Sequence, residues 1–288
     1  MISLRKKRVN KDLIMVKAVS ELVSTEWLEK NLRSKNLKVL DASWYLPNEN
    51  RNPQEEFSSR HIAGSRYFDI NSFSDPNDSL PHMVPSENRF CSELSKLGVS
   101  AGDHVVFYDG LGLFSAARAW WLLKLFGFTK VSILDGGLPK WVSENRPLTS
   151  EVGRSSSEFI TPKFNDKLVC DWKQVKLCIR DRPGQIIDAR PFDRFSGHAT
   201  EPRPGLRSGH IPGSINICYK ELLNEDHTLK NKELLYNIFV TKGLDLTLPI
   251  ISSCGSGVTA AILFLALEVI GAENLAIYDG SWAEWGSR

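Results

Sequence analysis

The segment LPIISSCGSGVTAAILFLAL, residues 248–267, decides how the fold of this chain is interpreted. It begins with a short apolar run, continues with a glycine-rich turn that holds Cys254, and ends in a longer apolar run. The first run is typical of a buried strand, and the second is typical of a helix that ends at Gly271. The same layout occurs at residues 104–123, HVVFYDGLGLFSAARAWWLL, where the predicted helix ends at Gly127. The sequence therefore contains two copies of a strand–turn–helix unit.

Three further blocks repeat in the same order and with similar gaps. They are KVLDAS (38–43) with QIIDAR (185–190), RHIAGSRYFDI (60–70) with GHIPGSINICY (209–219), and VSILDGGLPKW (131–141) with LAIYDGSWAEW (275–285). Short β-branched runs that alternate with helical stretches predict a parallel sheet covered by helices on both faces. The predicted fold class is therefore α/β, with two domains of similar fold.

The chain of 288 residues has the length of two domains. We expect a disordered basic tail over 1–17, a first domain over 18–145, a serine-containing linker over 146–165 and a second domain over 166–288. The tail has no apolar core that would make it a secretory signal. Translation that begins at Met15 is the alternative.

Composition excludes several classes of function. The chain is 42% hydrophobic and 24% charged with a net charge of +2, so nothing favours nucleic-acid binding. No stretch approaches the roughly 18 apolar residues of a membrane span. Its five cysteines are odd in number and form no Cys-x-x-Cys pair, which argues against a disulfide framework or a structural zinc site. We expect no metal, no membrane association and a cytoplasmic location.

Cys254 has three interpretations: a nucleophile, a metal ligand or a small buried side chain. It follows a predicted strand, where ligands of open parallel sheets bind, and Gly255 and Gly257 allow the backbone N–H groups to turn inward. The N-terminus of the next helix adds a positive dipole, so the turn favours an anion such as a thiolate. Gly110 occupies the matching position of the first copy, which leaves one nucleophile for two domains.

The motifs of the chain resemble the rhodanese superfamily, and within it the 3-mercaptopyruvate sulfurtransferases of bacterial type. The resemblance extends from about residue 24 to 285 and includes FSAARAWWLL, VSILDGGLPKW, EPRPGLRSGHIPG, CGSGVTA and YDGSWAEWGSR. It implies two rhodanese-like domains, each a parallel sheet flanked by helices, with the active site in the C-terminal domain. It also implies an enzyme that moves sulfur from 3-mercaptopyruvate, through a persulfide on Cys254, to thioredoxin, a small thiol or cyanide. Pyruvate is released, and no cofactor is implied.

The resemblance also assigns site residues. The nucleophile is Cys254, and the pattern DAR…RF…EPR places the substrate-binding arginines at Arg194 and Arg203. A planar guanidinium suits the carboxylate of an α-keto acid, and charge develops on the enolate oxygen as sulfur leaves. The persulfide-cradling loop comprises Gly255, Ser256, Gly257, Val258 and Thr259.

Members of this family are described with a catalytic relay in which the loop serine, here Ser256, bonds a histidine from the first domain. The matching histidine is His82. The acid that orients it in the family falls at Asn71 here, and an amide cannot stabilise an imidazolium as a carboxylate does. Either the relay is weaker in this chain or another acid such as Asp75 acts in its place.

Three other functions are the alternatives for a chain with these motifs. Thiosulfate sulfurtransferases use a loop with more positive charge after the cysteine, whereas Gly255–Val258 carries none, so we expect thiosulfate to be a poor donor. Cysteine phosphatases need an arginine six residues after the cysteine, where this chain has Ala260. A rhodanese-like binding module without turnover would not need Cys254, Arg194 and Arg203 together.

Overall fold

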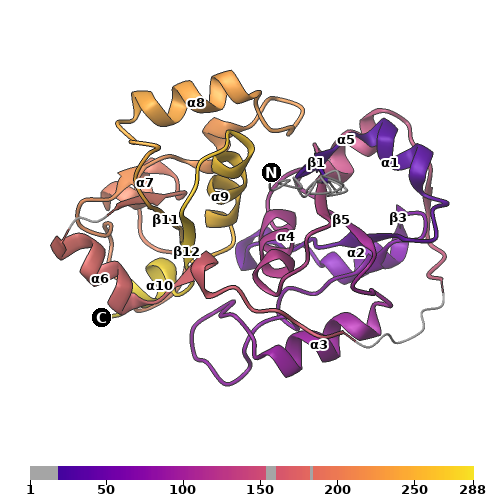
Figure 1. The fold of residues 1–288 in the computed structure, drawn as a ribbon, viewed down its shortest axis with the longest axis horizontal. Coiled ribbons are helices and arrows are strands. Elements are labelled where there is room, and N and C mark those ends of the chain that lie inside the picture. Colours follow the sequence, from indigo (N-terminus) through magenta and orange to yellow (C-terminus); the bar gives the residue numbers. More distant parts are fainter. Residues whose placement is uncertain (1–18, 154–159, 182–183) are drawn as a thin grey trace, which may run out of the picture.

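The computed structural model describes residues 19–153, 160–181 and 184–288. The predicted tail, 1–17, and the part of the predicted linker at 154–159 lie outside these residues. The chain forms two halves side by side, each with a five-stranded parallel sheet (Figure 1). The strands of the two sheets are β1 (Leu22–Val23), β2 (Leu37–Asp41), β4 (Arg66–Tyr67), β5 (His104–Tyr108), β6 (Val131–Leu134), β8 (Val169–Cys170), β9 (Gln185–Asp188), β10 (Ile215–Asn216), β11 (Ile250–Ser253) and β12 (Leu275–Tyr278).

The two sheets have the same topology. The first has the order β1-β6-β5-β2-β4, and the second, counted from the equivalent edge, has the order β8-β12-β11-β9-β10. In each sheet the strand that precedes the glycine-rich turn lies at the centre. The β5 register pairs Val106 with Val39, and the β11 register pairs Ser252 with Ile187. The predicted α/β fold of two similar parallel sheets is confirmed.

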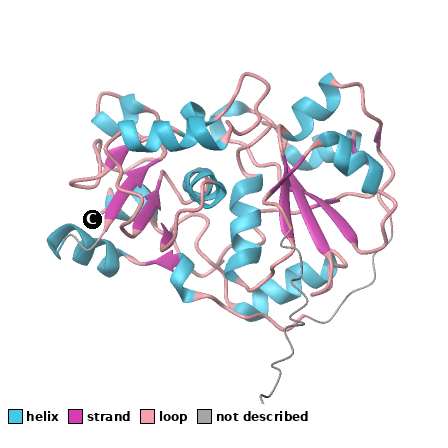
Figure 2. Ribbon diagram, turned by 45° about the horizontal axis from the view of Figure 1, so that its top comes forward, coloured by secondary structure: helices cyan, strands magenta, loops and turns pink. Residues whose placement is uncertain are grey.

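Helices lie on both faces of each sheet (Figure 2). The helices are α1 (Thr25–Asn31), α2 (Pro53–Ser59), α3 (Glu87–Lys96), α4 (Ala116–Leu125), α5 (Gly137–Ser143), α6 (Trp172–Asp181), α7 (Phe192–Ser196), α8 (Lys232–Thr241), α9 (Ala260–Val269) and α10 (Ser281–Trp285), with short 3-10 turns η1 (Pro47–Glu49), η2 (Asp166–Leu168) and η3 (Tyr219–Leu222). Strands that are covered in this way are buried on both faces, which is why the central parts of their sequences are largely apolar.

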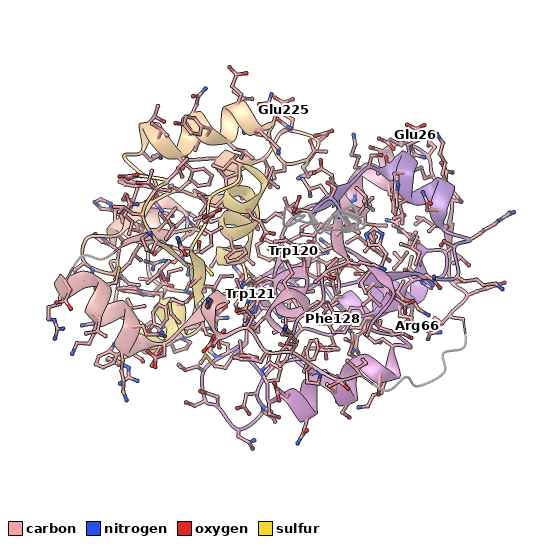
Figure 3. The ribbon with its side chains drawn as sticks, in the orientation of Figure 1. Glu26, Arg66, Trp120, Trp121, Phe128 and Glu225 are labelled. Atoms are coloured by element: carbon pink, nitrogen blue, oxygen red, sulfur yellow. The ribbon has the colours of Figure 1, made fainter. Side chains whose placement is uncertain are left out.

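Helices α4 and α9 pack against each other and join the two halves (Figure 1). Each is mostly apolar because one side covers its own sheet and the other side contacts the partner helix. The rings of Trp120 and Phe264 meet edge to face with centroids 6.1 Å apart. Trp121 Nε1 donates to the carbonyl of Leu168 in the second half. Figure 3 shows Trp120 and Trp121 in the middle of the molecule, between the two sheets.

Both of these helices end as the sequence predicts. Gly127 and Gly271 have φ values of +89° and +86°, which a residue without a Cβ adopts at no cost. The following residue then closes each helix with a backbone hydrogen bond, Phe128 to the carbonyl of Leu123 at 3.0 Å and Ala272 to that of Leu267 at 3.0 Å.

The predicted linker is attached to the first half at its beginning. There β7 (Leu148–Thr149) pairs antiparallel with β3 (His61–Ile62). Further along, the N–H groups of Lys163 and Asn165 donate to carbonyls at the end of α4. The domain limits at 18–145, 146–165 and 166–288 stay predictions.

Candidate active site

Cys254 lies directly after the central strand β11 and is 2% exposed. Two carbonyls of its loop are fixed by α10, because Trp282 N–H donates to Cys254 O and Ala283 N–H donates to Gly255 O, each at 2.9 Å. A trans peptide holds its C=O and N–H on opposite sides, so the N–H groups of Gly255 and Ser256 point away from α10. Among the described residues, no acceptor bonds the N–H of any residue from 255 to 259. The loop therefore offers unpaired donors to an anion.

Side chains of three arginines lie close to the two glycines of the loop. Gly257 has a φ of +79°, and a Cβ there would lie 3.0 Å from Nη1 of Arg118. A Cβ at Gly255 would lie 3.1 Å from Nη2 of Arg194 and 3.8 Å from Nη1 of Arg203. The two predicted substrate-binding guanidinium groups thus lie together over the backbone next to Cys254.

The two arginines differ in their partners. Arg194, on α7, donates from Nη2 and Nε to the carboxylate of Glu201 at 2.6 and 3.3 Å. Arg203 has no carboxylate partner in the described part of the chain, and its Nη2 donates to Ser256 Oγ at 3.2 Å. Burial lowers the pKa of Arg203, but an arginine keeps its charge at neutral pH. A half-buried, unpaired cation beside Cys254 favours an anion in the site.

A buried ionic network fixes Arg194 from behind. Arg190 is fully buried, and its guanidinium bonds the carboxylates of Asp188 at 2.8 Å and Glu201 at 2.7 Å. Glu201 therefore bridges a structural arginine and a site arginine. Carboxylates with two such partners are held in one orientation, and so is the Arg194 fork. The motifs DAR and EPR contain these residues, but the sequence did not indicate how they pair.

His82 comes from the first half and reaches the loop across the interface. Its Nδ1 lies 3.0 Å from Ser256 Oγ, and its ring packs edge to face against Trp44 at 4.8 Å. Burial lowers the pKa of His82 to about 3, with the nearby charges of Arg118 and Arg203 as further causes. The imidazole is therefore neutral at physiological pH.

No acid orients His82 among the described residues. Asn71 is exposed, and its hydrogen bonds in the described structure are those of its backbone, from its N–H to Asp69 Oδ1 and from the N–H of Ser74 to its carbonyl. Asp75 accepts from the N–H of Asn77 in a local turn. Neither residue forms a hydrogen bond with His82. Ser256 instead receives a hydrogen bond from Arg203 and shares one with a neutral ring.

The surrounding cavity has a volume of about 190 Å³ and is built from both halves. The second half supplies Cys254 and both arginines, and Tyr219 lines the wall. The first half contributes Trp44, Leu46, Glu49, Leu111 and Phe114 to the walls. A thiol, free amides and two guanidinium groups in a small cavity can bind an anion with its reactive atom against sulfur.

Reasoning from the sequence missed Arg118 and Asp279. Arg118 Nη2 donates to the carbonyl of His82 at 2.6 Å and to Asp279 Oδ1 at 2.7 Å. The available signal was an arginine inside the otherwise apolar helical stretch FSAARAWWLL, because a buried charge needs a partner.

These features define an α/β protein of two repeated domains, with a buried cysteine in the open glycine-rich loop of the second domain. Residues 24–144 and 171–288 each match the family described as "Rhodanese-like domain". The chain is 44% identical to "Thiosulfate/3-mercaptopyruvate sulfurtransferase 2" of Arabidopsis thaliana, over 92% of this chain and 84% of that protein. It is 42% identical to "3-mercaptopyruvate sulfurtransferase" of Escherichia coli K12, over 92% of this chain and 95% of that protein.

A crystal structure of a protein of this class from Escherichia coli superposes with a TM-score of 0.84 at 39% identity, over 92% of this chain and 99% of that one. The chain belongs to the rhodanese family, as a two-domain sulfurtransferase. No helix in the described ranges is long and apolar enough to cross a membrane.

Proposed function

We propose that the enzyme takes sulfur from 3-mercaptopyruvate and carries it as a persulfide on Cys254. The observation that carries this proposal is the pair of guanidinium groups, Arg194 and Arg203, over the backbone of Gly255 in a cavity of about 190 Å³. An α-keto acid with a sulfur on its third carbon presents a carboxylate and a carbonyl to the arginines and its sulfur to Cys254.

The reaction proceeds in two transfers. The Cys254 thiolate attacks the substrate sulfur, the new S–S bond forms and the C–S bond breaks, and its electron pair becomes the enolate of pyruvate. The enolate takes a proton and leaves as pyruvate. An acceptor then attacks the outer sulfur and restores the thiolate, so no external oxidant or reductant is needed.

The loop and the arginines stabilise different charges in this scheme. The unpaired N–H groups of residues 255–259 bind the thiolate and then the persulfide. Arg203 faces the enolate oxygen, and Ser256 connects Arg203 to His82. Because His82 is neutral, it acts in this scheme as a hydrogen-bond partner of Ser256 and not as a stored positive charge.

The choice of donor rests on the loop, since relatives of similar identity are named for both donors. Residues 255–258 carry no charge, and both nearby cations are held where a carboxylate would bind. We therefore propose 3-mercaptopyruvate as the better donor and thiosulfate as the poorer one. Steady-state kinetics with each donor tests this choice, and a higher kcat/KM for thiosulfate would reverse it.

The acceptor reaches the site through the mouth of the same cavity. Trp44, Phe114 and Tyr219 line it with aromatic rings, and Glu49 and Lys220 are exposed there. We propose thioredoxin, small thiols or cyanide as acceptors, all of which deliver a compact nucleophile. The five cysteines are all free thiols, which suits a reducing compartment, and we propose the cytoplasm as its location.

Intact mass spectrometry tests the mechanism. After donor alone, the wild-type protein gains the mass of one sulfur, and Cys254→Ser gains none and releases no pyruvate. A folded Cys254→Ser variant that still releases pyruvate would refute the nucleophile. A wild-type protein that releases no pyruvate would favour the alternative of a binding module.

A further inference from the structure

Each half of the molecule extends a short segment to the other half, which we call an arm: the first contains His82 and Val84, and the second contains His227 and Leu229. In the first arm, the N–H of Val84 donates to Oδ2 of Asp279 at 2.7 Å. In the second, the N–H of Leu229 donates to Oδ1 of Asp135 at 2.8 Å. Asp135 and Asp279 hold the same position in the repeated segments ILDGG and IYDGS. The two arms are therefore equivalent in their attachment.

The residue two positions before each arm N–H is a histidine with positive φ. His82 has a φ of +62° and His227 has a φ of +64°. The histidines face equivalent loop positions, because His82 bonds Ser256 and a Cβ at Gly112 would clash with His227. One arm thus reaches the loop with the cysteine, and the other reaches the loop without it.

The arm contact beside Cys254 includes an arginine, Arg118, that the equivalent contact at the other loop lacks. Arg118, on α4, pairs with Asp279, and both side chains are nearly fully buried. It also donates to the carbonyl of His82 and, from Nη1 at 3.4 Å, to that of Gly257. The repeat position that corresponds to Arg118 is Ile262, so Asp135 has no equivalent partner.

We propose that Asp279, acting through Arg118, is a positioning residue that holds His82 against Ser256. One carboxylate oxygen binds the arm at Val84 and the other binds Arg118, which in turn fixes the carbonyl of His82. A residue with positive φ is strained unless its surroundings hold it, and these bonds supply that restraint. This inference rests on the function proposed above for Ser256 and His82.

The test compares Asp279→Asn with its matched control, Asp135→Asn. Both substitutions weaken an arm bond, so both lower the melting temperature. Asp279→Asn lowers kcat for pyruvate release about 10-fold. It leaves KM for 3-mercaptopyruvate within about 2-fold, because the substrate-binding arginines, Arg194 and Arg203, are not disturbed. Asp135→Asn leaves both constants within about 2-fold of wild type. Equal kcat values in the two variants, measured well below both melting temperatures, would overturn the proposal.

A double-mutant cycle separates positioning from a general loss of structure. In a His82→Ala background, Asp279→Asn changes kcat by less than about 2-fold, because the group it positions is gone. Independent effects that multiply would overturn the proposal. If Asp279→Asn fails to fold, Arg118→Met combined with Asp279→Asn removes both buried charges, and the same loss of kcat is expected. A wild-type kcat in either folded form would again overturn it.

The outcomes also distinguish this inference from the proposed function. If wild-type protein forms the Cys254 persulfide and Asp279→Asn has the same kcat as wild type, only the positioning role fails. If wild-type protein forms no persulfide from 3-mercaptopyruvate, the proposed function itself fails. A wild-type kcat for His82→Ala would refute the role of His82 and the positioning role together.

Discussion

Asp109 and Ser253 hold the same position in the two repeats, and only the first of them fills its loop with a carboxylate. Asp109 accepts hydrogen bonds from the backbone N–H groups of Leu111, Phe114 and Ala116 at 2.8 to 2.9 Å. Ser253 is fully buried, and its Oγ has no hydrogen-bond partner in the described structure. The first loop therefore bonds its amides to its own carboxyl group, whereas in the described structure the amides of the second loop are unpaired, as the thiolate that we propose on Cys254 requires.

We expect Ser253→Asp to inactivate the enzyme. A carboxylate at this position would bond loop amides that the thiolate needs, and its charge would repel a negative charge on Cys254. Pyruvate release should fall at least about 100-fold, since several charge-assisted bonds are lost. Pyruvate release and intact mass after donor alone measure the effect.

Ser253→Ala is the matched control for that substitution. Its Oγ makes no hydrogen bond, so its removal leaves no partner unsatisfied. Activity should stay within about 2-fold of wild type. Equal losses in both variants would show that the site rejects any change at residue 253 and that the charge is not the cause.

We expect Arg203→Lys to lower kcat/KM for 3-mercaptopyruvate about 10- to 100-fold, because lysine keeps the charge but loses the planar fork. Among the described residues, no carboxylate pairs with Arg203, so we expect the planar shape of its own guanidinium to determine how it contacts the substrate. Arg207→Lys is the control, since Arg207 is exposed and its guanidinium donates to the carbonyl of Trp285. Unchanged kinetics for Arg203→Lys would show that Arg203 does not contact the substrate.

His82 makes the stability of the fold depend on pH. Its pKa is about 3 when folded, below the ordinary value of about 6.5 when unfolded. Between these values the unfolded chain binds a proton that the folded chain does not, so stability is lost as pH falls from about 6.5. From about pH 7 to about pH 5, wild type should lose about 2 kcal/mol more unfolding free energy than His82→Asn.

Urea unfolding of both proteins at the two pH values measures this difference. The carboxylates and the other histidines titrate in both proteins, so their contributions to the change in unfolding free energy cancel in the comparison. The same loss in wild type and His82→Asn would mean that His82 is not buried as a neutral ring.

We expect Asn71→Ala to leave kcat/KM within about 2-fold of wild type, because Asn71 forms no hydrogen bond with His82. His82→Ala, by contrast, should lower kcat about 10- to 100-fold, as the loss of a group from a catalytic relay does. Steady-state kinetics with 3-mercaptopyruvate compares the two. A loss for Asn71→Ala as large as that for His82→Ala would show that the amide orients the imidazole.

Local sequence determined much of the architecture. The repeated blocks predicted two equivalent parallel sheets because strand and helix periods are properties of short segments. The same local information placed the helix ends at Gly127 and Gly271, where a positive φ calls for glycine. It also placed Cys254 just past the end of a strand, which is where parallel sheets bind ligands.

The sequence by itself thus determined the two folds and the position of Cys254 in a glycine-rich loop, and it predicted Cys254 as the nucleophile. His82 was reached only through a family resemblance, and the bonds of Asp279 and Arg118 were not reached at all. In the sequence, Arg118 lies 36 positions after His82 (118 − 82), and Asp279 lies 197 positions after it (279 − 82). Tertiary structure decided their pairing, because contacts across a domain interface depend on how two folded surfaces meet, and no short segment records that.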